Sequence, residues 1–468
     1  MDSHYLTLTL YVFLIYWFIV SVLNRRGILQ RYNVTAYGPI LMIRTTRGQK
    51  LLEVLSQGAR RKTFWRTYAN IGTVLVLIAM TFMFVLVLLG AYATFMVQPE
   101  PTDLHTPRNL LLIPGLNEFI PLCAWIGFVV ALVVHELSHA VLGTVEKIKV
   151  KSMGLLVALI PIGAFAELDS EQLFGEKENG ERAVKDREPE QEPEKKKKVA
   201  TARERTRILS AGVTSNFVVA LIAFILFFSI LFSVQPVYES KGMKVIGATE
   251  GLPAANAGIK AGMSIIRMDD EKIEDYRGFF AFMNSTTPGQ VVEVQTKDEK
   301  FIVKLEKHPR GDKGFLGVVS AKGYLEYLRS IPSSFTTLSL RHWLSGCLIL
   351  MAMPFSSLEE GGFSSFYPLL SHLYEPVGAV SFLGGGIFVI ADVLFWTGWI
   401  NFYVGLFNCL PAIPLDGGYV FREMLNPVLR IGIKDEKKKE RIVKAITATI
   451  ALFVASAIVF TIAGPYLL

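Results

Sequence analysis

Long apolar runs with very few charged side chains are the feature that most constrains this chain. They lie at about residues 5–23, 71–96, 119–145, 210–234, 386–409 and 442–465. Each run can form a helix that crosses a hydrocarbon core of about 30 Å, which takes about 20 apolar residues. Only 19% of all residues are charged, against about 25% in soluble domains. The sequence therefore predicts a polytopic α-helical membrane protein with about six transmembrane helices in a lipid bilayer.

The overall charge and the cysteines exclude some classes of function. The formal net charge is only +7, which does not indicate a nucleic-acid partner. Cys123, Cys347 and Cys409 each stand alone in apolar surroundings, without a Cys-x-x-Cys or Cys/His spacing. They therefore indicate neither a disulfide framework nor a thiolate metal site.

The charges of the connecting segments predict how the chain is oriented, because cytoplasmic loops are enriched in Lys and Arg. Between the first two runs, ten basic residues stand against one acid, Glu53. Segments 146–209 and 411–441 are also rich in basic residues, whereas 97–118 has more acids than bases. We therefore expect a multi-pass protein of the cell membrane with both termini, and residues 235–385, outside the cytoplasm.

Three segments do not fit a simple series of helices. Residues 152–168 are apolar but short and broken by Gly and Pro, and a crossing there would invert every later loop. We interpret them as a re-entrant hairpin, which must be buried against protein or line a cavity. Residues 342–355 are shorter and are expected at the interface. Residues 171–201 are highly charged and predict a disordered cytoplasmic insertion.

Residues 235–320 have the pattern of a small soluble α/β domain, with short alternating strands and Gly/Pro turns. The stretch that begins GLPAANAGIKAG resembles part of PDZ domains, although Met263 stands where Asp is usual. Residues 314–317, Gly-Phe-Leu-Gly, resemble a carboxylate-binding loop, and the alternative is an ordinary glycine-rich turn. The expectation is an extracytoplasmic PDZ-like domain that takes peptides at a sheet edge.

The reactive residues lie in the third run, in the motif HELSH at 135–139. On a helix, His135 and His139 are about 40° apart around the axis and about 6 Å apart along it, so they can share one metal ion. Imidazole suits zinc, and Glu136 on the adjoining face can accept a proton from water at the metal. In a soluble helix these residues could be a solvated face. Within an apolar run, ionisable groups are costly and mostly functional.

Two histidines leave a zinc site one protein ligand short. Asp416, in the segment NCLPAIPLDGG at 408–418, is the acid that we take to lie at a similar depth. It could instead be a helix cap or turn acid before Gly417 and Gly418. As a ligand it would complete a catalytic site with an open fourth position, and the two glycines would let the backbone approach the metal.

Together these residues resemble the site-2 proteases, which are intramembrane zinc metalloproteases. The resemblance rests on HELSH (135–139), GAFAE (163–167), AGVTSN (211–216), the PDZ-like insert and NCLPAIPLDGG (408–418). It implies zinc bound by His135, His139 and Asp416, with Glu136 as the general base. It also implies substrate binding by Asn408 and by Gly163, Ala164 and Phe165 of the hairpin. Val213 departs from the family's usual Pro, which leaves the role of Asn216 open.

The resemblance implies a domain order and a function. The expected parts are an accessory N-terminal region (1–118), two halves of a catalytic membrane core (119–234 and 321–468), and the PDZ-like domain (235–320) between them. The expected function is hydrolysis of a peptide bond in or near a transmembrane segment, with the active site toward the cytoplasm and the substrate cut beforehand by another protease. The alternative is an inactive metal-binding receptor that binds peptides through its PDZ-like domain. A transporter would show internal repeats, and none is found.

Overall fold

The computed structural model describes residues 3–45, 48–110, 112–175, 198–237, 242–309, 311–356, 361–363, 365–368 and 370–467. The chain divides into two compact units. The first contains residues 1–101, 128–220 and 400–468, and the second contains residues 102–127 and 221–399. The HELSH motif and Asp416 both belong to the first unit.

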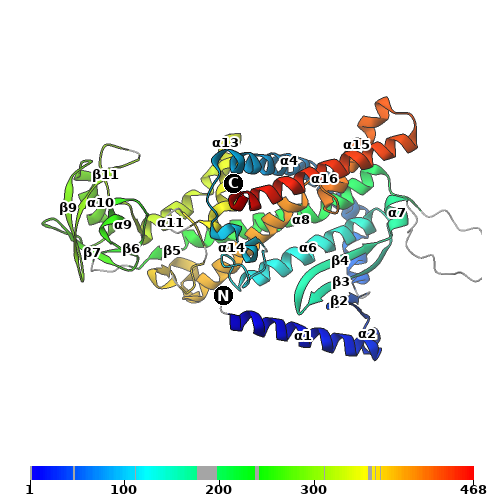
Figure 1. Ribbon diagram of the computed structural model, residues 1–468, viewed down its shortest axis with the longest axis horizontal. Coiled ribbons are helices and arrows are strands. Elements are labelled where there is room, and N and C mark those ends of the chain that lie inside the picture. Colours follow the sequence, from blue (N-terminus) through cyan, green and yellow to red (C-terminus); the bar gives the residue numbers. More distant parts are fainter. Residues whose placement is uncertain are drawn as a thin grey trace, which may run out of the picture. The chain divides into compact units, whose positions relative to one another are not determined.

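Five helices among the described residues are long and apolar enough to cross a membrane (Figure 1). They are α4 (Ala59–Val97), α6 (Ala124–Val145), α8 (Ala202–Phe232), α14 (Gly386–Asn408) and α16 (Glu436–Leu467). Each one overlaps one of the last five predicted runs. The prediction of a polytopic, mainly helical membrane protein is therefore confirmed.

The first predicted run does not add a sixth spanning helix to this set. Residues 5–23 lie in α1 (Ser3–Arg25), a helix of 23 residues whose described side chains begin at Tyr11. The described residues therefore confirm five of the predicted crossings, and the crossing by residues 5–23 stays a prediction. The predicted interfacial segment 342–355 lies in a short apolar helix, α13 (Leu340–Ala352), and the 3-10 turn after it.

A four-stranded antiparallel sheet in the first unit joins two distant parts of the sequence (Figure 1). Its order is β1–β2–β3–β4, and the strands are β1 (Val34–Tyr37), β2 (Ile40–Thr45), β3 (Val150–Ala158) and β4 (Ile160–Leu168). β3 and β4 form a hairpin across the predicted segment 152–168, with Met153 opposite Ala166. β2 pairs with the other edge of β3, so none of the described strands pairs with the outer edge of β4. The membrane depth of this hairpin stays a prediction.

This sheet takes two strands from the basic N-terminal segment. Residues 24–70 contain β1, β2, α3 (Gln49–Ser56) and the first turns of α4. The insertion predicted at 171–201 also begins in regular structure, because α7 (Ser170–Phe174) is capped by the Asp169 side chain, which accepts a hydrogen bond from Gln172. Most of that insertion, residues 176–197, lies outside the described residues.

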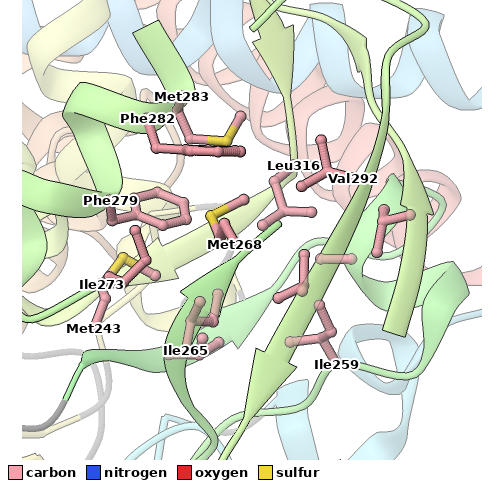
Figure 2. Packing of buried hydrophobic residues seen from close by; sticks show 14 of the residues in the cluster. Met243, Ile259, Ile265, Met268, Ile273, Phe279, Phe282, Met283, Val292 and Leu316 are labelled. Carbon is pink, nitrogen blue, oxygen red and sulfur yellow. The ribbon is translucent and has the colours of Figure 1, made fainter. Parts of the chain in front are cut away.

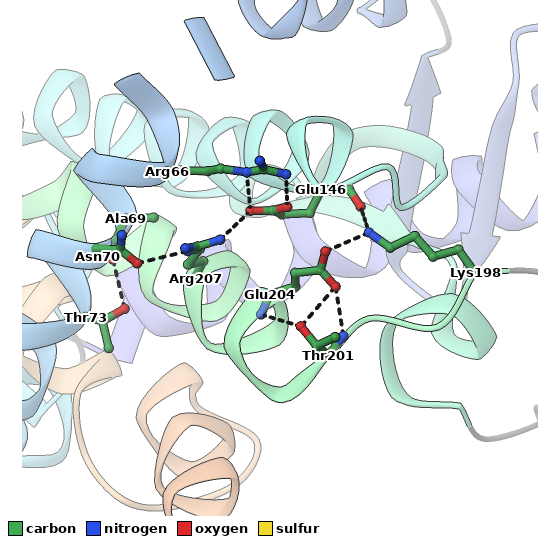
Figure 3. Close-up of polar contacts among 9 residues, drawn as sticks. All are labelled: Arg66, Ala69, Asn70, Thr73, Glu146, Lys198, Thr201, Glu204 and Arg207. Carbon is green, nitrogen blue, oxygen red and sulfur yellow. Dashed lines mark hydrogen bonds and ion pairs between the residues drawn. The ribbon is translucent and has the colours of Figure 1, made fainter. Parts of the chain in front are cut away.

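A buried carboxylate just after α6 links three helices of the first unit (Figure 3). Glu146 has a fully buried side chain and pairs with Arg66 of α4 at 2.8 Å and with Arg207 of α8 at 3.0 Å. Arg207 also donates a hydrogen bond to Oδ1 of Asn70, at 2.9 Å. A fully buried carboxylate is costly unless cations compensate its charge, and both arginines do so here. These contacts therefore hold α4 firmly against the two helices that carry HELSH and AGVTSN.

Residues 243–320 of the second unit form a small α/β unit. Its sheet has the order β10–β9–β7–β6–β13, with β8 beside β7. The strands are β6 (Met243–Ala248), β7 (Ser264–Met268), β8 (Glu271–Lys272), β9 (Val291–Thr296), β10 (Lys300–Lys304) and β13 (Val318–Ser320). Buried side chains from this sheet and from α10 (Tyr276–Ser285) form its core, among them Ile265, Met268 and Phe279 (Figure 2). Its identity as a PDZ-like domain stays a prediction.

The second unit also contains a buried acid that the sequence interpretation overlooked. Asp392 lies within α14, is 3% exposed, and accepts hydrogen bonds from the backbone N–H groups of Phe366 (2.7 Å) and Tyr367 (2.9 Å). Two charge-assisted hydrogen bonds satisfy a buried carboxylate. Asp392 therefore fixes a neighbouring loop to α14, and it lies inside the apolar run 386–409, whereas Asp416 follows that run.

Candidate metal centre

Three of the predicted side chains lie together although the sequence separates them widely. Nε2 of His135 and Nε2 of His139, both on α6, are 3.2 Å apart. They lie 3.1 Å and 3.2 Å from Oδ2 of Asp416. Both histidines are buried, at 8% exposure. Within the described ranges, this is the one group of three or more His, Cys, Asp or Glu donors that could hold a metal ion.

The spacing and the electrostatics of these three atoms fit a metal ion. Tetrahedral ligands with bonds of about 2.0–2.1 Å lie about 3.3–3.4 Å from one another. Nδ1 of His139 lies 2.7 Å from the carbonyl oxygen of Ile208 and can donate to it, so Nε2 of the neutral ring is an acceptor that faces Asp416. Acceptors that converge in this way repel one another unless a cation lies among them. The residues present therefore suit an ion with three protein ligands and an open fourth position.

Asn216 of α8 lies behind the first histidine. Its Nδ2 is 3.3 Å from Nδ1 of His135, while its buried Oδ1 has no hydrogen-bond partner among the residues that the structure describes. The two ends of an amide are exchanged by a half-turn of the side chain. After that turn, Oδ1 accepts a hydrogen bond from Nδ1–H of His135 and leaves Nε2 free to bind a metal, the usual arrangement for a ligand histidine.

Gly212 of α8 leaves room for the imidazole rings of both histidines, and the sequence alone did not indicate this role. A Cβ atom at this position would lie 2.5 Å from Nε2 of His139 and 2.7 Å from Cε1 of His135. Real Cβ atoms do not approach other atoms so closely. The available sequence signal was a glycine inside an otherwise apolar helical run, which usually has a packing or functional reason.

Asp416 is the first residue of α15 (Asp416–Gly432), a helix that is held in place by a second ion pair. Glu423 of α15 accepts two hydrogen bonds from Arg205 of α8, at 2.9 and 2.8 Å. Gly417 and Gly418 lie close to the backbone of the preceding turn. A Cβ at Gly418 would lie 2.5 Å from the backbone nitrogen of Ile413, so these glycines let α15 begin tightly against the preceding turn.

Glu136 lies beside the metal centre and contacts the hairpin. Its Oε2 accepts a hydrogen bond from the backbone N–H of Ala166 on β4, at 2.9 Å. Gly163, Ala164 and Phe165, the predicted substrate-binding residues, belong to the same strand. The fold therefore brings the proposed base and the proposed substrate-binding strand into direct contact.

Asn408 and Glu167 have local hydrogen-bond partners. Nδ2 of Asn408 donates to the carbonyl oxygen of Val404 one turn earlier in α14, at 3.1 Å. Oε2 of Glu167, the hairpin acid next to Ala166, accepts a hydrogen bond from the Ser152 hydroxyl at 2.6 Å. Glu167 is therefore occupied within the hairpin and is not a member of the ligand group.

Hydroxyl groups in hydrogen-bond contact connect α4 to α6, the helix that carries HELSH. The hydroxyl of Tyr68 is 2.7 Å from that of Ser215, and Ser138 donates to Ser215 at 2.6 Å. Ser138 is the fourth residue of HELSH. Sequence reasoning gave no role to Tyr68, because the contact depends on the packing of α4, α6 and α8.

Comparisons with known proteins agree with this geometry. A family model described as Peptidase family M50 matches residues 123–454, more than half of the chain. An uncharacterized protein of Methanocaldococcus jannaschii is 23% identical over 437 residues, which cover 90% of this chain and 86% of that protein. A Clostridium perfringens protein with the provisional name of zinc metalloprotease is 23% identical over 334 residues, or 66% of this chain and 88% of that protein. The 437-residue match is longer than the family match and extends beyond it.

Proposed function

Because the chain belongs to peptidase family M50, the family of the site-2 proteases, we propose that it is a zinc-dependent protease that cuts peptide bonds within or near transmembrane segments. Membership supports a membrane metalloprotease in general. The observation that carries the finer proposal is the convergence of His135, His139 and Asp416, with donor atoms 3.1–3.2 Å apart, beside Glu136.

The proposed chemistry assigns one task to each group. Zinc bound by the three side chains would polarise the scissile carbonyl and make a nearby water more acidic. Glu136 would accept the proton of the attacking water and pass it to the leaving amine. Ile208 and Asn216 would hold the two imidazoles by their Nδ1 atoms, so that each Nε2 stays directed at the metal.

The substrate would have to be an extended segment. A peptide bond in a transmembrane helix is hidden by its own hydrogen bonding, and its freed N–H and C=O groups need partners in a dry environment. The outer edge of β4, the strand that contains Gly163, Ala164 and Phe165, offers such partners. Asn408 could join them only after giving up its bond to Val404.

The expected partner is a transmembrane protein that another protease has already cut. The small α/β unit at 243–320 would act outside the cytoplasm as a PDZ-like domain, either by binding the trimmed end or by excluding bulky ectodomains. The second cut would then release a cytoplasmic fragment, as in regulated intramembrane proteolysis. The alternative of an inactive receptor is less favoured, because a receptor would not need to keep Glu136 or Asp416.

Chemical labelling tests the proposed orientation. In a variant without the native cysteines, Lys50→Cys and Asp435→Cys should react with a membrane-impermeant maleimide only from the cytoplasmic side. Lys297→Cys should react only from outside. All three positions are exposed, so burial does not limit the reaction. Labelling of position 297 from the cytoplasm would contradict the assignment that rests on loop charge.

Metal content and hydrolysis test the proposed function together. The purified protein should contain about one zinc per chain and cut a model transmembrane peptide in detergent micelles. A strong chelator should abolish cutting, and added zinc should restore it, because the metal supplies the electrophile. The His135→Ala variant is the control that should lose both metal and activity. A parent protein with bound zinc and no hydrolysis of any membrane peptide would favour the receptor alternative.

A further inference from the structure

The proposed general base is hydrogen-bonded to a sheet edge that pairs with none of the described strands. Glu136 accepts its bond from the backbone N–H of Ala166, and β4 is the last strand of its sheet. In an antiparallel pair, the N–H and C=O of one residue point either both toward the neighbouring strand or both away from it. Ala166 therefore directs its N–H and C=O away from β3. Ala164, two residues earlier in an unbroken register, shares this orientation.

A substrate strand that pairs with β4 must use the same groups. Strand addition depends on main-chain hydrogen bonds to the exposed edge. The single N–H of Ala166 cannot make a well-aligned bond to a substrate carbonyl and to the Glu136 carboxylate at once. A substrate strand in register across Ala166 would therefore displace Glu136.

We propose that the Ala166 amide holds Glu136 aside until a substrate strand pairs with β4 and takes over that amide. This inference rests on the proposed function, since it assigns Glu136 as the base of a protease. Ala166 acts through Glu136 and is a positioning residue. The arrangement makes proton transfer depend on an extended substrate in the correct register, and it discriminates against chains that reach the metal without pairing.

Two substrates and one substitution test the proposal. The first substrate is a transmembrane peptide in micelles, and the second is a blocked tripeptide, which offers few main-chain groups for pairing. Ala166→Pro removes the outward N–H, and proline is tolerated at such an edge position. We expect the kcat for the tripeptide to rise about fivefold or more. The Glu136 carboxylate no longer has to break a hydrogen bond to the Ala166 N–H, and hydrogen bonds to charged groups are strong. The KM for the transmembrane peptide should rise, because one pairing bond is lost.

Ala164→Pro is the matched control, because it removes the neighbouring outward N–H, which does not contact Glu136. It should also raise the KM for the transmembrane peptide, but the kcat for the tripeptide should not rise. Zinc content should stay near one per chain in both variants. The inference is wrong if Ala166→Pro leaves the tripeptide kcat unchanged or lowers it, or if Ala164→Pro raises it equally.

A measurement without catalysis separates this inference from the proposed function. In protein labelled with 15N-alanine, the Ala166 and Ala164 amide signals are identified by their loss in the two proline variants. The chemical shift of the Ala166 amide should change in Glu136→Ala. The chemical shifts of both amides should change when the transmembrane peptide is added to metal-depleted parent protein. An Ala166 amide whose chemical shift is unchanged in Glu136→Ala overturns the inference. A parent protein that binds no zinc and cuts neither peptide overturns the proposed function, while the response of Ala166 to Glu136→Ala would still stand.

Discussion

The Asp416→Asn variant is expected to lose both zinc and proteolysis. The carboxylate oxygen lies 3.1 and 3.2 Å from the two histidine nitrogens, where a third ligand of a tetrahedral site belongs. The neutral amide of Asn is a weaker ligand and no longer balances the charge of the ion. Metal analysis of the purified variant should therefore show well under one zinc per chain.

Glu136→Gln should behave differently, because Glu136 is not a member of the three-residue ligand group. Its loss removes the proton acceptor and leaves the two histidines and Asp416 in place. Zinc should remain near one per chain, while hydrolysis of the transmembrane peptide falls about 10²-fold or more, as expected for lost acid–base catalysis. Gln can still accept a hydrogen bond from Ala166 through its carbonyl oxygen, so the local packing is retained.

The contrast between these two variants decides the ligand set. His135→Ala is the reference for a broken site, and the parent protein is the reference for an intact one. Full zinc and full activity in Asp416→Asn would show that the assignment of the third ligand is wrong. Loss of zinc in Glu136→Gln would show that Glu136 has a structural part in the metal site.

The residues of the candidate centre could be predicted because helix periodicity is a local property. His135 and His139 share a face of α6 by spacing alone, and a buried ion needs a further anionic ligand, which pointed to Asp416. The five long spans could also be predicted from the sequence, because a bilayer imposes a minimum length on each helix. Nothing in these inferences required knowledge of how the helices pack.

The features that sequence reasoning missed are those that depend on long-range packing. β2 pairs with β3 although more than a hundred positions separate Leu41 from Val157, its partner, and no local pattern specifies that pairing. Asp392 was overlooked because its partners are the backbone groups of Phe366 and Tyr367, which any residue could supply. The hydrogen bond from Ala166 to Glu136 likewise follows only from the placement of β4 beside α6.

Gly212 is the clearest case of a residue whose importance lies in an absent side chain. It leads to the second prediction with a large effect, which is that Gly212→Ala should impair metal binding. The added methyl group would lie 2.5 Å from Nε2 of His139, the atom that would bind the ion. Either α8 must move outward or the imidazole must turn, and both changes disturb the ligand geometry.

The matched control is Gly72→Ala, in which the same substitution crowds the same helix at another point. A Cβ at Gly72 would lie closest to Oγ1 of Thr214 on α8 and 2.7 Å from its Cγ2, and neither histidine is among its three nearest neighbours. Overpacking costs about 1–3 kcal/mol, which corresponds to about 5–150-fold in an equilibrium constant. In Gly212→Ala we expect this loss in zinc affinity, measured by competition with a chelator, together with loss of hydrolysis. In Gly72→Ala we expect the cost to appear as a lower free energy of unfolding, measured by thermal denaturation. Zinc affinity should stay near that of the parent, because the strain does not reach the ligands. Equal loss of zinc affinity in both variants would show that α8 transmits any crowding to the metal centre, and that Gly212 has no special place beside the histidines.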